Sequence, residues 1–82
     1  MAMMKIASLL RIARRRRDLP APDMRRQIRV MAGLTQAEMA GILGVDRASV
    51  ARWETTKGAP RNPTLDKYTE LLERLQREVL AS

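Results

Sequence analysis

Arginine accounts for thirteen of the sixteen basic residues in this chain, and the sequence contains neither histidine nor cysteine. A guanidinium group carries a permanent charge and a planar fork of N–H donors, which suits contact with phosphates and with the edges of bases. The missing residue types exclude imidazole acid–base catalysis, thiol chemistry, disulfide bonds and zinc fingers. A net charge of +7 favours a polyanionic partner. We therefore expect a binding protein that uses no cofactor or metal, and not an enzyme.

The positive charge is gathered in the first part of the sequence. Residues 1–19 hold six basic side chains against one acidic side chain, whereas residues 64–82 hold three against four. Phosphates would repel the C-terminal segment, so a polyanion is expected to meet the N-terminal segment and the middle of the chain. We expect the C-terminal segment to take part in self-association instead. The densest basic cluster is the run Arg14, Arg15, Arg16 and Arg17.

Helices must position these side chains, because the apolar residues are mostly Leu, Ile, Val, Met and Ala, with only one Trp and one Tyr. A length of 82 residues allows one domain. Apolar residues at helical spacing predict a first helix over residues 3–17, which Pro20 and Pro22 prevent from continuing. Pro22 also suits the first turn of a second helix that stops at Gly33. Its buried stripe is expected to consist of Met24, Ile28 and Met31.

Three further helices follow, each with a recognisable start. Thr35 and Glu38 form the pattern of a capping box, in which each residue satisfies a backbone donor of the other. Gly44 is expected to end this helix in a left-handed turn, and Asp46 to cap the next one, which runs to about Glu54. Thr64 is expected to cap a last helix. Together these signals predict an all-α fold.

Two short helices joined by a turn with a central glycine have the proportions of a helix-turn-helix. The residue types resemble those of the lambda repressor and Cro family, also called the xenobiotic-response-element class, over about residues 24–75. This resemblance implies a compact lambda repressor-like domain of four to five helices over residues 20–82, with residues 1–19 as an extra basic N-terminal arm or helix. The matching residues are Gly33-Leu34-Thr35-Gln36, Met39-Ala40, Leu43-Gly44-Val45, Val50, Trp53-Glu54 and Pro60.

The helix at residues 46–54 has two different faces when it is turned by about 100° per residue. Val50 and Trp53 lie on one face and are expected to be buried. The opposite face carries arginines separated by alanines, whose small size would let the backbone approach the major groove of DNA. Arginine donors match guanine O6 and N7, and alanine can touch a thymine methyl group. The expected base-reading residues are Arg47, Ala48 and Arg52; the alternative is an ordinary amphipathic helix with solvated arginines.

The resemblance also assigns roles around this helix. The family residue that matches Gln36 contacts the DNA backbone, and the one that matches Glu54 pairs with an arginine of the first family helix, which implies an Arg29–Glu54 ion pair here. The loop that follows departs from the family, because Thr56 stands where glycine is usual. For all of these charged and polar residues the alternative is a solvated surface position. The expected phosphate-contacting residues are Gln36, Ser49, Lys57, Arg61, Arg14, Arg15, Arg16 and Arg17.

Apolar residues of the last helix are spaced three and four residues apart, which suits packing on the domain core or on a second copy of the chain. Both possibilities follow from the pattern. A homodimer would place two reading helices roughly 34 Å apart, one DNA turn, on a near-palindromic operator. The residues expected at the dimer contact are Leu71, Leu72, Leu75 and Val79.

These features predict a sequence-specific, double-stranded DNA-binding transcriptional regulator of the phage repressor or Cro type. We expect a bacterial or bacteriophage protein that acts in the cytoplasm at the nucleoid. The alternative function is that of an antitoxin, which would repress its own operon and bind a toxin, or another phage or host protein. A third possibility places a basic amphipathic N-terminal helix on an anionic membrane. No stretch is long and apolar enough to span a membrane, and we expect no membrane partner.

Overall fold

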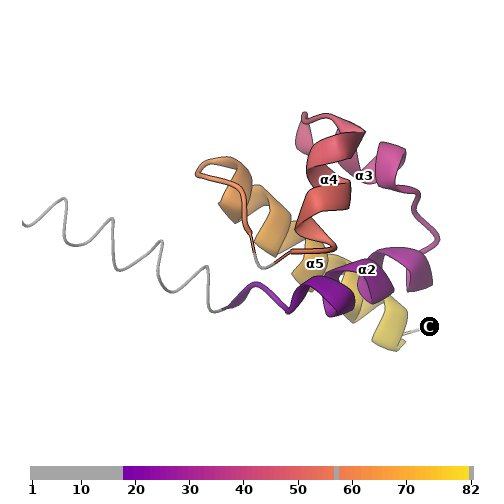
Figure 1. The fold of residues 1–82 in the computed structure, drawn as a ribbon. Helices are drawn as coiled ribbons and strands as arrows, with labels where there is room; N and C mark the ends of the chain where they lie inside the picture. Colours follow the sequence, from indigo (N-terminus) through magenta and orange to yellow (C-terminus); the bar gives the residue numbers. More distant parts are fainter. Residues whose placement is uncertain (1–17, 57, 82) are drawn as a thin grey trace, which may run out of the picture.

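The computed structural model describes residues 18–56 and 58–81, and this part of the chain is helical without strands (Figure 1). The all-α fold expected from the sequence is confirmed. The helix expected over residues 3–17 lies outside the described residues. The described helices are α2 (Pro22–Met31), α3 (Gln36–Leu43), α4 (Arg47–Trp53) and α5 (Thr64–Ala81).

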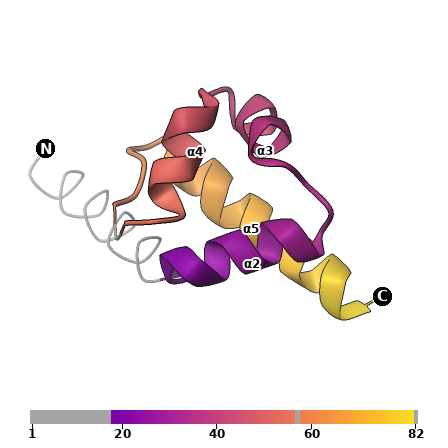
Figure 2. The same ribbon diagram turned by 45° about the vertical axis from the view of Figure 1, so that its right-hand side comes forward.

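The helices are arranged as two contacting pairs. Helix α2 crosses the long helix α5, and the short helices α3 and α4 pack against each other (Figures 1 and 2). Helix α3 also contacts α5, which closes the core between the pairs. This arrangement leaves one side of α4 at the surface, as Figure 2 shows.

Helices α3 and α4 begin and end where the sequence indicated. The Thr35 hydroxyl accepts a hydrogen bond from the Glu38 N–H (3.0 Å), and the Glu38 carboxylate accepts one from the Thr35 N–H (2.9 Å). Gly44 ends α3 in the left-handed region with φ 71°, and the Asp46 carboxylate accepts from the Ser49 N–H at 3.1 Å. A Cβ added at Gly44 would meet no atom within 4 Å, so its backbone angle is what requires glycine.

Helix α5 begins differently from the expectation. Thr64 was expected to precede the helix as its cap, but it is the first helical residue. The Lys67 N–H donates to the Pro63 carbonyl (3.2 Å), so the chain is already wound at Pro63. The fixed φ of proline is close to the helical value, so Pro63 suits the start of the first turn.

The core is built from side chains of all four described helices and from Leu19, which precedes α2. Val50 and Trp53 are buried, as expected for the inner face of α4. The Trp53 and Tyr68 rings lie 5.3 Å apart with a 40° tilt, which joins α4 to α5. The buried apolar residues are Leu19, Ile28, Met39, Ala40, Leu43, Val50, Trp53, Leu65, Tyr68 and Leu72.

The buried stripe expected on α2 is wrong at two of its three positions. Ile28 is buried, but Met24 is 44% and Met31 is 67% exposed. Arg25 and Arg29 are buried instead. The inward face of α2 is therefore rotated about Ile28 toward the arginines, because the interior supplies acceptors that satisfy both guanidinium groups. Hydrophobic periodicity alone does not contain that information.

The buried hydroxyl of Tyr68 generates a stability prediction. Tyr68 is fully buried, and its hydroxyl has no hydrogen-bond partner within the described part of the chain. Burial raises the pKa of this hydroxyl to about 12. Because an unpaired buried polar group costs about 1–3 kcal/mol, Tyr68→Phe should leave the free energy of unfolding unchanged or raise it. Urea denaturation followed by circular dichroism measures the change.

The neighbouring Thr69 provides the matched control. Its buried hydroxyl donates to the Leu65 carbonyl at 2.8 Å, so Thr69→Val removes a hydroxyl that has a partner. This variant should lose about 0.5–1.5 kcal/mol. An equal loss in Tyr68→Phe would contradict the assignment of an unpaired hydroxyl.

Candidate DNA-binding surface

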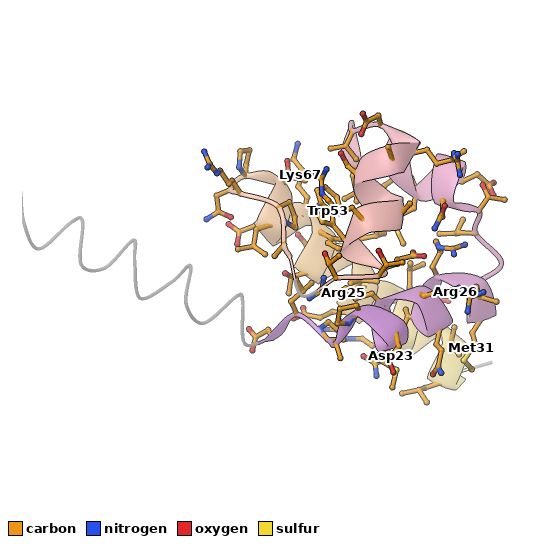
Figure 3. All side chains as sticks on the ribbon, viewed as in Figure 1. Asp23, Arg25, Arg26, Met31, Trp53 and Lys67 are labelled. Carbon is orange, nitrogen blue, oxygen red and sulfur yellow. The ribbon has the colours of Figure 1, made fainter. Side chains whose placement is uncertain are left out.

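Helix α4 presents the three expected base-reading residues on one exposed face. Arg47, Ala48 and Arg52 are exposed, whereas Val50 and Trp53 on the opposite side hold the helix in the core. Figure 3 shows Trp53 directed from α4 into the molecule. The two arginines thus extend from a rigid support, and the alanine between them adds little bulk.

A buried ion pair connects α2 to the C-terminal end of α4. Arg29 Nε lies 2.6 Å from Glu54 Oε2, and Nη2 lies 2.9 Å from Oε1. The third donor, Nη1, bonds to the Leu34 carbonyl at 2.8 Å. The side chains are only 9% and 1% exposed, and the hydrogen bonds that the Arg29 guanidinium donates to Glu54 raise the pKa of Arg29. The pair implied by the family resemblance is therefore present with two-pronged geometry.

Gln36 links this buried pair to the exposed face of α4. Its side-chain N–H donates to Glu54 Oε1 at 3.1 Å, and its carbonyl oxygen accepts from Arg47 Nη1 at 3.4 Å. One of the two amide hydrogens remains for a phosphate. Gln36 was expected only at the DNA backbone, and the structure adds a second position for it, between the ion pair and a reading arginine.

The other expected phosphate-contacting residues differ in how far the structure supports their role. The Ser49 hydroxyl donates its hydrogen to Asp46, so Ser49 serves as a partner of the helix cap. Arg61 is exposed, and together with Arg52 it lines an open cleft of about 390 Å³ between α4 and the following loop. Two cations at one cleft suit an anion such as a phosphate. Outside the described residues lie Lys57, Arg14, Arg15, Arg16 and Arg17.

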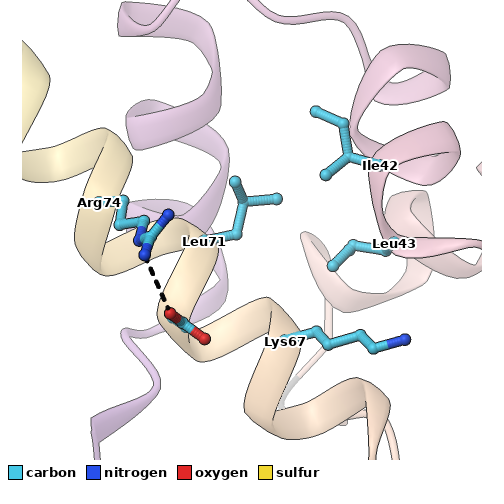
Figure 4. A pocket seen from close by; sticks show the side chains of 6 residues that line it. Ile42, Leu43, Lys67, Leu71 and Arg74 are labelled. Atoms are coloured by element: carbon cyan, nitrogen blue, oxygen red, sulfur yellow. Dashed lines mark ion pairs between the residues drawn. The ribbon is translucent and has the colours of Figure 1, made fainter.

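The expected dimerisation residues face different surroundings. Leu72 is 1% exposed and belongs to the domain's own core, so it is not available to a second copy; this part of the expectation is wrong. Leu75 is partly buried and packs against the core, and so does Leu71, which lines a groove of about 230 Å³ between α3 and α5 (Figure 4). Val79 lines an apolar cleft between α2 and the end of α5.

One buried polar residue at this surface has no counterpart among the sequence expectations. Arg25 lies between α2 and the lower end of α4 (Figure 3), where Nη1 donates to the carbonyls of Trp53 (2.9 Å) and Gly58 (2.8 Å). Its Nε donates to the Pro20 carbonyl at 2.6 Å. The spacing of four residues between Arg25 and Arg29 was the available signal, because it places both guanidinium groups on one face of α2.

This geometry defines a helix-turn-helix DNA-binding domain, with α3 and α4 as the two helices of the motif. A protein-family model described as helix-turn-helix matches residues 26–78, well over half of the chain. The chain therefore belongs to the lambda repressor/Cro-like helix-turn-helix family, and it is a DNA-binding regulator of transcription. Searches of curated proteins and of solved structures give no match. Within residues 18–56 and 58–81 no helix is both long and apolar enough to cross a membrane.

The Arg29–Glu54 pair should carry a large share of the stability. Glu54→Gln removes the charge and leaves the Arg29 guanidinium buried without a counter-ion, which should cost about 3–5 kcal/mol of unfolding free energy. The surface pair Arg74–Glu70 is the matched control, because its side chains are 71% and 57% exposed. Glu70→Gln should cost less than about 1 kcal/mol. Equal losses in urea denaturation at neutral pH would contradict the assigned importance of the buried pair.

The cap of α4 predicts a dependence of stability on pH. Hydrogen bonds from the side chain and then the backbone of Ser49 lower the pKa of Asp46. A lowered folded-state pKa means that the stabilisation is present above the ordinary pKa and is lost as the pH falls through the folded-state value, below about pH 4. Asp46→Asn keeps a capping oxygen that does not titrate. The melting temperature of this variant should therefore fall less on acidification than that of the unmodified protein.

The comparison requires a variant without any cap. Asp46→Ala should melt at a lower temperature than Asp46→Asn at neutral pH, because it removes the acceptor altogether. Melting followed by circular dichroism between pH 7 and pH 2.5 gives both quantities, with the interval chosen to span the ordinary carboxyl pKa of about 4. Parallel pH curves for Asp46→Asn and the unmodified protein would show that the Asp46 charge contributes nothing.

Proposed function

We propose that this protein is a sequence-specific repressor of the phage repressor or Cro type. In this proposal α4 enters the major groove of a bacterial or bacteriophage operator, and the bound protein excludes the polymerase or a competing protein. The observation that carries the proposal is the exposed face of α4, where Arg47, Ala48 and Arg52 extend from a helix held by Val50 and Trp53. Such a regulator acts in the cytoplasm, at the nucleoid.

The two reading arginines are supported differently, which suits two separate base contacts. Arg47 is in reach of the Gln36 carbonyl, so its guanidinium is partly oriented before DNA arrives. Arg52 lies one helical turn and a half further along α4 and borders the cleft shared with Arg61. An arginine that contacts guanine O6 and N7 contributes about 1–3 kcal/mol of discrimination.

Phosphate contacts hold the domain on the duplex in this proposal. Two observations support this: the Gln36 side chain bonds to Arg47 at the start of α4, and Arg61 borders a cleft with Arg52 toward the end of α4. Lys57 and the basic segment before residue 18 add further phosphate contacts in this proposal, which is based for these residues on their charge in the sequence. Each neutralised phosphate makes the affinity more sensitive to salt, with a slope of about −0.9 per contact.

Two copies of the chain bind a near-palindromic operator in this proposal. The support is an apolar surface at the far end of the molecule from the loop after α4, where Met31 is 67% and Leu80 is 79% exposed. Met31 and Leu80 line the apolar cleft between α2 and the end of α5, of about 100 Å³, together with Val79. Scattered exposed apolar residues need no partner, but a contiguous group on two helices marks a contact surface. A homodimer would place two α4 helices roughly 34 Å apart, one DNA turn.

Selection of bound duplexes from a random DNA pool tests this function. The unmodified protein should select a short inverted repeat that contains guanines. Arg47→Ala and Arg52→Ala should each relax the preference at defined positions, by about 1–3 kcal/mol. Arg74→Ala is the matched control, because it removes an exposed arginine of α5 that lies outside the reading face.

Three results would contradict the proposal in different ways. Uniform weakening over all sequences in the Arg47 and Arg52 variants would make these residues phosphate contacts. Equal binding to every duplex by the unmodified protein would refute sequence-specific reading. Selection of an isolated half-site would refute the homodimer and leave the reading face intact.

A further inference from the structure

Arg25 is a buried cation whose hydrogen-bond partners within residues 18–56 and 58–81 are backbone carbonyls. The residue is 5% exposed, and its donors reach the carbonyls of Pro20, Trp53 and Gly58. Among the described residues no carboxylate forms an ion pair with it. Burial lowers the pKa of this guanidinium from its usual value. A charge removed from water without a counter-ion is costly, so these carbonyl groups must offset much of that cost.

The carbonyl groups belong to two parts of the chain that are distant in sequence. Pro20 precedes α2, Trp53 ends α4, and Gly58 lies in the loop that follows. The last carbonyls of a helix lack partners within the helix, and a cation near them is favourable. A guanidinium holds its donors in one rigid plane, so it fixes these carbonyls relative to one another. With the same nitrogen, Nη1, Arg25 thus binds the carbonyl of the last residue of α4 and holds the loop that follows at Gly58.

The loop held in this way leads to Arg61. Gly58 lies three residues before Arg61, whose side chain borders the cleft of about 390 Å³ together with Arg52 of α4. Two residues before Gly58, the Thr56 hydroxyl donates to the Arg52 carbonyl at 2.9 Å. Two anchors thus set the position of Arg61 relative to the reading helix. One is the set of bonds that tie Gly58 back to the end of α4, and the other is the hydrogen bond from the Leu65 N–H to the Arg61 carbonyl at 3.0 Å.

We infer that Arg25 is a positioning residue for DNA binding, which holds the loop after α4 so that Arg61 meets the phosphate backbone beside the reading helix. Arg25 does not touch DNA in this arrangement, because its guanidinium is occupied inside the protein. The inference rests on the proposed function, in which Arg61 contacts a phosphate. It makes one specific claim: the contribution of Arg61 to binding depends on Arg25.

A double-mutant cycle tests this dependence. Affinity for a labelled duplex is measured over a range of salt concentrations for the unmodified protein, Arg25→Met, Arg61→Met and the double variant. In the unmodified protein, Arg61→Met should reduce the slope of log affinity against log salt by about 0.9, the value of one phosphate contact. In the Arg25→Met background the same change should reduce the slope by less than half as much, because the loop no longer holds Arg61 in place.

Arg26 supplies the matched control cycle. It is the next residue of α2, it is exposed, and Arg26→Met removes the same charge. Arg61→Met should keep its full effect in the Arg26→Met background. Non-additivity confined to the Arg25 cycle would therefore reflect the position of the loop rather than the net charge, and a residue with only a general role in stability would not produce it.

The outcomes separate this inference from the proposed function. A full effect of Arg61→Met in the Arg25→Met background would overturn the inference, and so would the absence of any effect in the unmodified protein. Failure of the unmodified protein to bind duplex DNA would refute the proposed function instead. Circular dichroism establishes that each variant is folded. If Arg25→Met does not fold, Arg25→Lys replaces it, because lysine keeps the charge but has a single donor nitrogen; full additivity in that cycle would equally overturn the inference.

Discussion

The two buried charges of Arg29 and Glu54 impose the strongest constraint on this small domain. Each carries a desolvation cost that the opposite charge of the other offsets in large part, so α2 and the end of α4 must meet at one relative position. Glu54 also accepts a hydrogen bond from Gln36, whose carbonyl lies in reach of Arg47. The direction of a surface arginine is thereby connected to a pair of charges in the interior, across three of the four described helices.

The features that the sequence predicted are those encoded by neighbouring residues. The capping box of Thr35 and Glu38, the glycine turn at residue 44 and the cap at Asp46 each depend on a few consecutive side chains and the backbone between them. The division of α4 into a buried and an exposed face follows from periodicity within one helix. The family resemblance added the Arg29–Glu54 pair, which joins residues 25 positions apart and has no local signal.

The remaining features depend on what each side chain meets in three dimensions. The stripe of α5 has the same spacing whether it covers the domain's own core or a second copy, and the structure shows that Leu72 does the former. By hydrophobicity alone, Met24 and Met31 fit a buried stripe better than arginine does. Arg25 and Arg29 are buried instead, because they form hydrogen bonds with backbone carbonyl groups and with the Glu54 carboxylate. The Ser49 hydroxyl donates its hydrogen to Asp46, and this hydrogen bond competes with the phosphate contact expected for Ser49.

The turn between α3 and α4 places a requirement on chirality rather than on size. No atom lies within 4 Å of a Cβ added at residue 44, so the Cβ itself would cause no collision there. The cost would arise from the positive φ, which disfavours L-amino acids and is compatible with their mirror images. Asparagine, which tolerates this region, would disturb the turn less than valine despite their similar volumes. The crossing of α3 and α4 thus depends on the left-handed backbone conformation of one residue, Gly44.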